Sequence, residues 1–452
     1  MGSNKQPHVA AFAFPFSSHP AQVLNVIRKA STAAPDVTFS FFSTEKSIST
    51  LFGSKPEEGN IKGYVISDGL PENYVFTGNP LEPIGLFPKS AADIFRKGVE
   101  VAVSETNKKI TCVVSDGFLW FAGQIAEELG VPWVPIWASG LSSLSMHFYT
   151  DLIREKFGVP PTGKENSKLD FIPGMSEMQV GDFPEEVIGP NIDTEFAQMM
   201  HRTGKELPHA SAVAINSFDE LESPFLKDLH SKFKLCLPIG PLTFLSPPSS
   251  DPTNGPTGCI SWLDAHEQET VAYISFGTFA TPPPNELAAL AEAVEDSNTP
   301  FLWVLKEAEK VHLPNGFLNR TSERGMVVPW SPQIKVLEHP SIGVFITHCG
   351  WNSVLEGIMC GVPLIFRPFL GDHTLIGRLV SDVWKIGIKA HGGIFTKDDV
   401  LNALDLIFAK EEGKKIRENV QALKKHGKEA FDPTGSTTKN FNTLVEMITS
   451  CE

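Results

Sequence analysis

Short apolar segments alternate with longer amphipathic ones along most of the chain. The apolar segments are rich in β-branched and aromatic side chains and are too short for helices, which is typical of strands buried on both faces. Strands are predicted at Val9–Phe14, Thr38–Phe42, Thr111–Ser115, Val131–Ile136, Ala212–Asn216, Val271–Phe276, Phe301–Leu305, Gly343–Thr347 and Pro363–Phe366. Between them, the spacing of apolar positions predicts helices such as Phe118–Leu129 and Asn285–Asp296. The alternation predicts an α/β fold with parallel sheets covered by helices on both faces.

One stretch interrupts this alternation. Residues 241–258 are rich in proline, serine and glycine and offer little to bury, so they are expected to form a linker. The linker separates residues 1–240 from residues 259–432, and each part has enough strands for a doubly wound, Rossmann-like sheet of its own. Ligands of such sheets bind at the carboxyl ends of the strands, so a site is expected in the turns that follow them.

The composition of the 452 residues fits a globular enzyme without a nucleic-acid or membrane partner. The formal net charge of −15 disfavours nucleic acid and anionic membranes as partners. No apolar run reaches the length of a membrane span, and the six cysteines are scattered without a disulfide or metal pattern. A reduced, cytoplasmic location without stable membrane insertion is expected. We also expect a monomer.

The turn after the predicted strand Gly343–Thr347 has the features of a phosphate-binding site. A helix follows this turn directly, and its free N–H groups and dipole favour an anion. Gly350 lets the backbone approach a ligand, while Asn352 and Ser353 place side-chain donors at the helix start. His348 can add one more donor, although taken alone it is better explained as a buried histidine at a strand end.

The segment Trp330–His373 resembles, position by position, the sugar-nucleotide-binding box of plant small-molecule UDP-glycosyltransferases. It reads WSPQIKVLEHPSIGVFITHCGWNSVLEGIMCGVPLIFRPFLGDH. The resemblance implies the GT-B architecture, in which two Rossmann-like domains face each other across a cleft. It makes residues 259–432 the UDP-sugar-binding domain and residues 1–240 the acceptor-binding domain. A carboxy-terminal helix within residues 433–452 is expected to pack back on the first domain.

The resemblance also implies a role for each matching residue of the donor site. Uracil would stack on Trp330, Gln333 would lie near the base or ribose, and Glu356 would accept hydrogen bonds from the ribose hydroxyls. The residues implied to contact the diphosphate are Thr278, His348, Gly350, Asn352 and Ser353, and those implied to face the sugar are Trp351, Asp372 and His373. The UDP-sugar is a co-substrate, and no metal or other cofactor is expected, because helix dipoles and hydrogen bonds can neutralise the leaving diphosphate. For Trp330 alone, a position in the core is the alternative.

Two further residues match the catalytic pair of the same family. His19 lies between the first predicted strand and a helix that starts near Pro20, and Asp116 follows the strand Thr111–Ser115 and is expected to begin a helix. Transfer of a sugar to a hydroxyl needs a base that takes the proton, and a carboxylate that orients this base makes it more effective. The resemblance implies that His19 is the general base and Asp116 its partner, in a reaction that inverts the anomeric carbon. Without the donor box, a loop histidine and a helix N-cap would be the better explanation.

The similarity to one branch of the family extends over the whole chain. Segments such as Phe12–His19, Val131–Arg154, Asn216–Glu222 and Ile274–Pro284 are similar to flavonoid 3-O-glycosyltransferases. This similarity implies a flat phenolic acceptor, a flavonol or an anthocyanidin. The residues expected to contact it are Ser18, Leu81, Phe118, His147 and Phe183. Most aromatic side chains of the first half are nevertheless expected in its core.

Two departures from the family pattern bear on the donor sugar. The box ends in Asp372-His373, where a glutamine linked to glucose is usual, and a terminal histidine is associated with galactose donors. Ala138 stands where several relatives have a threonine that touches the sugar. Together these changes slightly favour galactose over glucose, while a neutral variant in a glucosyltransferase remains the alternative. Trp351, where glucuronosyl enzymes often carry arginine, argues against a glucuronate donor.

Other function classes remain in competition. A transferase for another phenolic or terpenoid aglycone and a non-catalytic nucleotide-sugar-binding protein both share the donor box. A nicotinamide-dependent dehydrogenase is disfavoured because no G-x-G-x-x-G follows the first strand. The chain also lacks the G-x-x-x-x-G-K-[ST] of P-loop kinases and the G-x-S-x-G of α/β-hydrolases.

Overall fold

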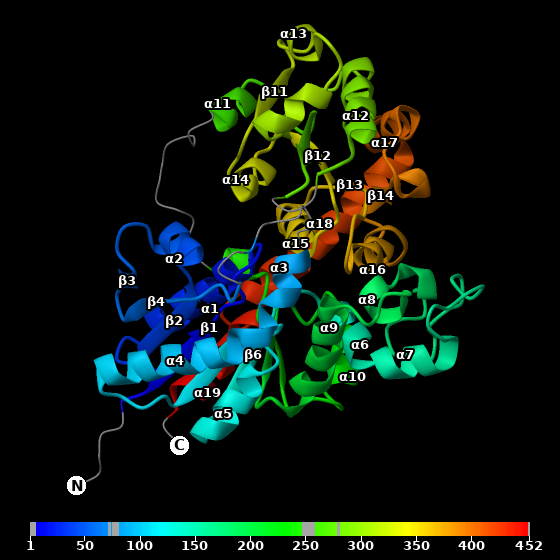
Figure 1. The fold of residues 1–452 in the computed structure, drawn as a ribbon. Helices are drawn as coiled ribbons and strands as arrows, with labels where there is room; N and C mark the ends of the chain where they lie inside the picture. The colour runs from blue at the N-terminus through cyan, green and yellow to red at the C-terminus, as the bar shows by residue number, and fades with distance from the viewer. Residues whose placement is uncertain (1–5, 71–73, 75–80, 246–257, 278–280, 451–452) are drawn as a thin grey trace. The chain divides into compact units, whose positions relative to one another are not determined.

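The computed structural model describes residues 6–70, 74, 81–245, 258–277 and 281–450 of the chain. Contacts divide the chain into two compact units (Figure 1). The first consists of Met1–Pro248 and Ala430–Glu452, and the second of Ser249–Glu429. The carboxy-terminal end of the chain therefore belongs to the first unit. Residues 246–257 of the expected linker lie outside the described part of the chain.

An eight-stranded sheet organises the first unit, in the order β3-β4-β2-β1-β5-β6-β7-β8. Neighbouring strands are parallel, apart from the antiparallel pair β3 and β4. The strands are β1 (His8–Phe12), β2 (Thr38–Thr44), β3 (Glu57–Glu58), β4 (Ile61–Ile66), β5 (Cys112–Asp116), β6 (Trp133–Trp137), β7 (Val213–Ile215) and β8 (Cys236–Pro238).

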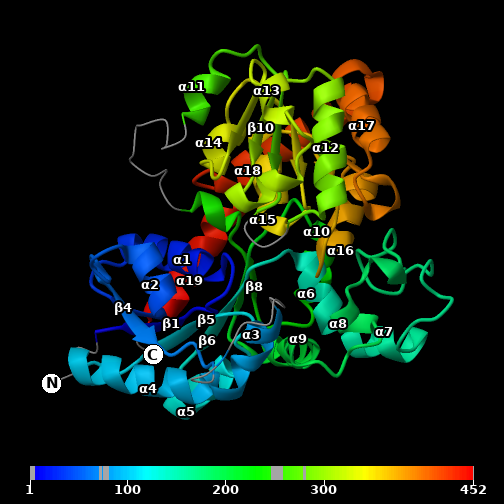
Figure 2. The same ribbon diagram turned by 45° about the horizontal axis from the view of Figure 1, so that its top comes forward.

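Helices cover both faces of this sheet because its strands are apolar on both sides. Val9 and Ala11 of β1 pack in one core cluster with residues of α1 (His19–Ala33) and of the last helix, α19 (Ser436–Thr449) (Figure 2). Phe12 alternates to the opposite face, where its ring lies 4.6 Å from that of Phe95 in α4 (Pro88–Thr106). The last helix thus completes the hydrophobic core of the first unit.

A six-stranded parallel sheet organises the second unit, in the order β11-β10-β9-β12-β13-β14. The strands are β9 (Val271–Ser275), β10 (Phe301–Val304), β11 (Gly325–Val328), β12 (Ile342–Thr347), β13 (Leu364–Phe366) and β14 (Gly387–Lys389). Helices α12 (Pro284–Asp296) and α17 (Lys397–Ala409) pack together on one face, around a core that includes Trp303 and Ile346.

Each sheet has a point at which the strand order reverses. In the first unit the chain runs outward from β1 through β2 to β4, then restarts on the other side of β1 with β5. In the second unit it runs outward from β9 to β11, then restarts on the other side of β9 with β12. Connections leave such a neighbouring pair in opposite directions, which opens a crevice at the carboxyl ends of the two strands. The turns after β1, β5, β9 and β12 are therefore the places where a ligand fits.

The strands predicted from the sequence are all present, each within two residues of its predicted bounds. Those that the pattern did not predict, β3, β4, β8, β11 and β14, lie at or beside a sheet edge and are short or carry polar residues. The helix expected from Phe118 was placed too early, because α5 begins only at Ala122. The Asp116 carboxylate accepts the Phe118 N–H, at 2.9 Å, and this local bond holds a turn where helix was expected. Asp116 is thus the last residue of β5 and not a helix N-cap.

No helix within the described ranges combines the length and the hydropathy needed to cross a bilayer.

Candidate active site

A histidine and a carboxylate meet at the reversal point of the first sheet. His19 is the first residue of α1, in the connection that leaves β1, and Asp116 ends the neighbouring strand β5. The Nδ1 atom of His19 lies 2.7 Å from Oδ2 of Asp116. The Asp116 side chain is 1% exposed and that of His19 is 16% exposed, so the pair is sheltered with one edge open to solvent.

The hydrogen bond sets the state of the imidazole ring. An ionised carboxylate can only accept, so Nδ1 of His19 carries the hydrogen and donates it to Asp116. In the neutral ring, Nε2 then keeps its lone pair and can take a proton from a substrate hydroxyl. Because Oδ1 of Asp116 is held by the Phe118 N–H, the carboxylate cannot easily rotate away from the ring.

Aromatic side chains surround the open edge of this pair. The ring centroid of Phe118 lies 4.7 Å from that of His19, and that of Phe14 lies 5.3 Å away. The ring centroid of Trp137 lies 5.8 Å from that of Phe118 and 5.6 Å from that of His147. We call Phe14, Phe118, Trp137 and His147 the aromatic row. Flat apolar faces next to a base suit a planar aromatic acceptor whose hydroxyl is to be deprotonated.

The acceptor residues expected from the sequence are placed unevenly around this row. Phe118 touches His19 directly, and His147 joins through Trp137. Ser18 is the N-cap of α1 beside the base, and its hydroxyl accepts a hydrogen bond from Gln22 at 3.1 Å. Phe183 is buried where the 3₁₀ helix η1 (Val180–Asp182) ends, and none of the described ring contacts links it to the row. Leu81 begins α3 (Leu81–Leu86), but its side chain lies outside the described part of the chain.

A cavity of about 310 Å³ opens in the second unit at the carboxyl ends of β9 and β10. Three residues assigned to the nucleoside from the sequence, Trp330, Gln333 and Glu356, share its wall. Gln333 donates from Nε2 to Glu356 Oε2 at 2.7 Å and lies 3.3 Å from the Ser353 hydroxyl. The full wall consists of Tyr273, Ser275, Phe276, Gly277, Thr281, Pro282, Val304, Leu305, Lys306, Glu309, Pro329, Trp330, Ser331, Gln333 and Glu356.

Trp330 is a large aromatic residue with 54% of its surface exposed. This exposure excludes the alternative of a core position for Trp330. A flat ring at the rim of a cavity with mixed polar and apolar walls can stack on a base, while carboxylate and amide oxygens within reach can accept hydrogen bonds from hydroxyls.

The turn after β12 holds His348 close against two glycines. A Cβ atom at Gly277 would lie 3.1 Å from the His348 ring, and one at Gly350 would collide with its Nε2. Cys349, between His348 and Gly350 in the chain, has a φ of +66°, a backbone conformation that residues other than glycine rarely adopt. The backbone of this turn is therefore shaped around the ring, at the reversal point between β9 and β12.

Helix α15 (Trp351–Cys360) begins directly after this turn, with Gly350 as its N-cap. Its first turn carries Trp351, Asn352 and Ser353, so the N–H groups of a helix start and polar side chains gather beside His348. Burial, assisted by the nearby His373, lowers the pKa of His348 to about 3. His348 is thus a neutral hydrogen-bond donor at ordinary pH. Thr278, the remaining diphosphate candidate, lies outside the described residues.

The end of the box lies near the same turn. Asp372 is the N-cap of α16 (His373–Arg378), and the ring of His373 lies 5.1 Å from that of His348. The Phe369 N–H donates to Nδ1 of His373 at 3.5 Å, a long bond. Burial lowers the pKa of His373 to about 4, so this ring is neutral too.

No group of three or more His, Cys, Asp or Glu side chains suited to a metal ion exists among the residues that the structure describes. Both ring nitrogens of His339, another histidine of the donor box, are engaged in hydrogen bonds. Nδ1 lies 2.8 Å from the Ser341 hydroxyl and Nε2 lies 3.1 Å from the Asp264 carboxylate.

Comparison with known proteins decides the family. The family described as UDP-glucoronosyl and UDP-glucosyl transferase matches residues 89–431. The chain belongs to this UDP-glycosyltransferase family. It is 50% identical over 455 residues to an anthocyanidin 3-O-galactosyltransferase of Rhododendron delavayi, an alignment that covers 98% of each chain. It is 49% identical over 445 residues to an anthocyanidin 3-O-glucosyltransferase of Vitis vinifera, covering 98% of this chain and 97% of the relative.

The fold comparison gives the same family. A crystal structure of a UDP-glucose:anthocyanidin 3-O-glucosyltransferase in complex with UDP superposes with a TM-score of 0.92. The two are 42% identical, and the match covers 98% of this chain and 99% of the other. The GT-B fold expected from the sequence, with its two Rossmann-like domains, is therefore confirmed.

Two buried residues of this glycosyltransferase that the sequence analysis missed hold site elements in place. Glu222 accepts the N–H groups of Leu141 and Ser142 at the start of α6 (Leu141–Phe148), each at 2.9 Å, and the hydroxyl of Ser217 at 2.7 Å. Burial raises the pKa of its carboxyl group although these bonds oppose the shift. Since α6 carries His147, Glu222 fixes one end of the aromatic row.

The second missed residue is Tyr273, on β9. Its hydroxyl donates to Gln333 Oε1 at 3.1 Å, which turns the amide nitrogen of Gln333 toward Glu356. The same hydroxyl lies 2.9 Å from that of Ser331. In the sequence this tyrosine looks like one more apolar residue of a buried strand, and only its contacts with Gln333 and Ser331 reveal its polar role.

Proposed function

We propose that the chain transfers a hexose from a UDP-sugar to the 3-hydroxyl of a flavonoid, a flavonol or an anthocyanidin. The observation that carries the proposal is the sheltered His19–Asp116 pair, with its free Nε2 edge set among the rings of Phe14 and Phe118. The relatives named for anthocyanidin 3-O-galactosyl and 3-O-glucosyl transfer, each about half identical over nearly the full chain, support the acceptor class.

The first unit supplies the base in this mechanism. The acceptor hydroxyl donates its hydrogen bond to Nε2 of His19 and passes its proton there as the oxygen attacks the anomeric carbon. The bond from that carbon to the UDP oxygen breaks in the same step, and attack from the side opposite to UDP inverts the configuration. The Asp116 carboxylate stabilises the imidazolium that forms, at a distance of 2.7 Å.

The second unit supplies the donor. Trp330, Gln333 and Glu356 are suited to the uridine, because they combine an exposed ring with hydrogen-bonding groups in one cavity. His348 and the first turn of α15 are suited to the diphosphate, where they stabilise the negative charge that develops on the leaving UDP. This set of neutral donors can act without a metal ion, so the UDP-sugar is proposed as the sole co-substrate.

The proposed sugar is galactose in slight preference to glucose. His373 is placed beside His348 and has its Nδ1 occupied by the Phe369 N–H, so its Nε2–H edge is left to reach a hydroxyl. Similar relatives act with either sugar according to their names, so glucose transfer by the same machinery is the second candidate.

Turnover of quercetin with UDP-galactose and with UDP-glucose, measured side by side, tests the proposal. We expect transfer to the 3-hydroxyl with a β-linkage, established by NMR of the product, and a higher kcat/KM with UDP-galactose. A faster reaction with UDP-glucose would overturn the sugar preference alone. Transfer only to a terpenoid or a simple phenol in a parallel panel would overturn the flavonoid assignment. Binding of both donors without any transfer would leave a nucleotide-sugar-binding protein.

A further inference from the structure

A sheltered ion pair in the second unit links chain segments beyond those that form the donor site. Arg367, directly after β13, donates from Nη2 to Glu286 Oε1 at 2.8 Å and from Nε to Oε2 at 3.1 Å. Glu286 lies in the first turn of α12 and also accepts the Phe395 N–H at 2.8 Å. The side chains of Arg367 and Glu286 are only 15% and 2% exposed. We call Arg367, Glu286 and the Phe395 N–H the Arg367 clamp.

The clamp reaches the end of the donor box through Phe369. The guanidinium carbon of Arg367 lies 3.9 Å from the centroid of the Phe369 ring, and the Phe369 N–H donates to His373. Phe276, which lines the donor cavity, contacts the rings of both Phe369 and Phe395, at 6.1 and 5.8 Å. The segments after β9, β13 and β14 therefore meet on one ion pair.

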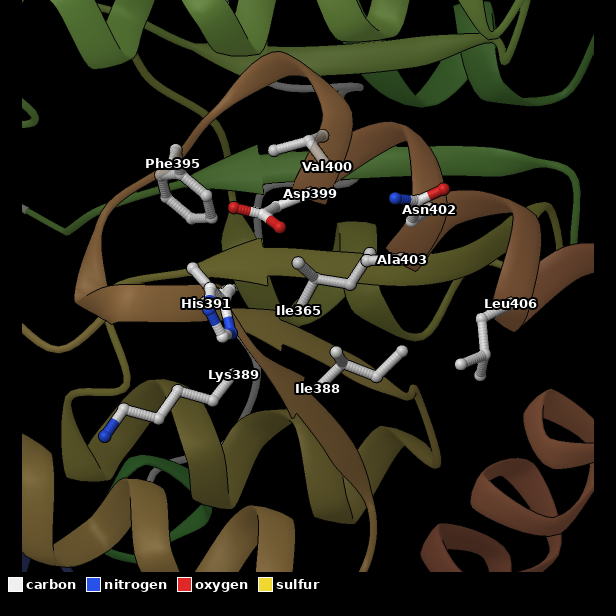
Figure 3. A pocket seen from close by; sticks show the side chains of 11 residues that line it. Ile365, Ile388, Lys389, His391, Phe395, Asp399, Val400, Asn402, Ala403 and Leu406 are labelled. Atoms are coloured by element: carbon white, nitrogen blue, oxygen red, sulfur yellow. The ribbon is translucent and has the colours of Figure 1, made fainter.

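The Phe395 side of the clamp combines a buried side chain with one backbone bond, and the Phe395 ring belongs to the core of the second unit. A separate cavity of about 190 Å³ lies between β13, β14 and α17, and the side chains of Phe395 and His391 border it (Figure 3). A segment beside a cavity gains less from packing than one set in a filled core. The bond from the Phe395 N–H to Glu286 adds a directional constraint, which apolar packing lacks, on how this segment stands relative to residues 367–373.

We propose that the Arg367 clamp positions the Asp372–His373 turn and thereby sets the discrimination between donor sugars. The inference rests on the proposed function, since it names a determinant of sugar choice. A sheltered ion pair is weak evidence for stability but fixes geometry well, because two parallel bonds and a stacked ring allow one arrangement of the guanidinium. The nucleoside side of the site has its own bonded set, Tyr273, Gln333 and Glu356, so its affinity is expected to be independent of the clamp.

The conservative variant Arg367→Lys tests this. Lysine keeps the charge opposite Glu286 but cannot form both parallel bonds or stack flat on Phe369. We expect the ratio of kcat/KM for UDP-galactose to that for UDP-glucose to move at least about threefold, while the Kd of UDP stays within about twofold, because only the sugar end is repositioned. Phe369→Leu keeps the ion pair and removes the stack, and it should change the same ratio in the same direction.

Arg320→Lys is the matched control. Arg320 forms a bidentate ion pair with Glu295 in the same unit, away from the donor box. Its replacement should therefore leave the sugar ratio and the Kd of UDP unchanged. An unchanged sugar ratio in both Arg367→Lys and Phe369→Leu would overturn the inference, as would an equal loss of UDP affinity and turnover. If the unaltered chain transfers neither sugar, the proposed function fails. The clamp is then judged on the Kd values of the two UDP-sugars relative to UDP, measured without acceptor.

Discussion

Replacing Asp116 by asparagine isolates the role of the carboxylate charge. Asparagine has the same shape, and its side-chain oxygen can keep the hydrogen bond from the Phe118 N–H that holds the turn. Its amide nitrogen would then face Nδ1 of His19, where donor would meet donor. The ring can restore a hydrogen bond only by moving its hydrogen to Nε2, and Nε2 is then no longer a base.

The size of the loss follows from the geometry. At the 2.7 Å separation between Nδ1 and Oδ2, an effective dielectric constant of about 20 gives an attraction of about 6 kcal/mol for a full imidazolium charge. If about half of that charge has developed in the transition state, the lost stabilisation is about 3 kcal/mol, or about a hundredfold in rate. The wrong tautomer adds to this, so kcat should fall by about 10²- to 10⁴-fold.

The assay is initial-rate turnover with a flavonol acceptor, together with calorimetric measurement of the Kd of UDP. The Kd should stay within about twofold, because the residues proposed to hold UDP belong to the second unit. Asp151→Asn is the control, since Asp151 forms another His–Asp pair in the first unit, 2.6 Å from His201 and exposed to solvent. Retention of more than about a tenth of wild-type turnover by Asp116→Asn would refute the reasoning, and so would an equal loss in the control.

Three further predictions concern the donor. Trp330→Ala should weaken UDP binding about 5- to 150-fold, the worth of one base stack, and a smaller change in calorimetry would place uracil elsewhere. His373→Gln should shift the kcat/KM ratio toward UDP-glucose by about fivefold, the scale of one hydrogen bond. Glucose and galactose differ only in the direction of the sugar's 4-hydroxyl, so an unchanged ratio would show that another residue distinguishes this group. Burial lowers the pKa of His348 to about 3 and that of His373 to about 4, so both rings are neutral above about pH 6 even if the bound diphosphate raises these values by one or two units. Protonation would strengthen anion binding, so affinity for a UDP-sugar should be constant from about pH 8 to 6 and rise only below that range, and a rise between 8 and 6 in the same titration would contradict the burial argument.

The local pattern of the sequence carries much of the fold. Buried strands of β-branched and aromatic residues are recognisable one at a time, because their period and length are local properties. The strands that escaped prediction, such as β4 and β14, mix polar and apolar positions, since a position at or beside the sheet edge buries less of the strand. The start of α5 escaped for a different reason, because a single side-chain bond from Asp116 to the backbone competes with the helix.

The candidate site was predictable only as far as its residues follow strands. Both His19 and Asp116 stand at carboxyl ends, but their contact depends on β1 and β5 being neighbours, which the resemblance supplied and the pattern alone could not. The roles of Glu222 and Arg367 were out of reach, because the partners that give them these roles, Leu141 and Ser142 for Glu222 and Glu286 for Arg367, are 80 or 81 residues away and the bonds depend on tertiary packing. The residues around a charged side chain in the sequence do not show which distant partner makes its burial acceptable.

The charge of the chain connects these observations to the chemistry. A molecule with a net charge of −15 has no overall field to draw in an anionic donor, so the donor must be held by short-range groups. The groups proposed to hold the donor are neutral, since burial lowers the pKa of His348 to about 3 and the start of α15 offers dipoles. Neutral donors stabilise charge as it develops on the departing diphosphate, yet they hold the finished product less tightly than fixed cations would. An arrangement of this kind favours release of UDP after each transfer, and the pH-independence of donor binding between about pH 8 and 6 is the property by which it differs measurably from a site that holds the diphosphate with histidinium cations.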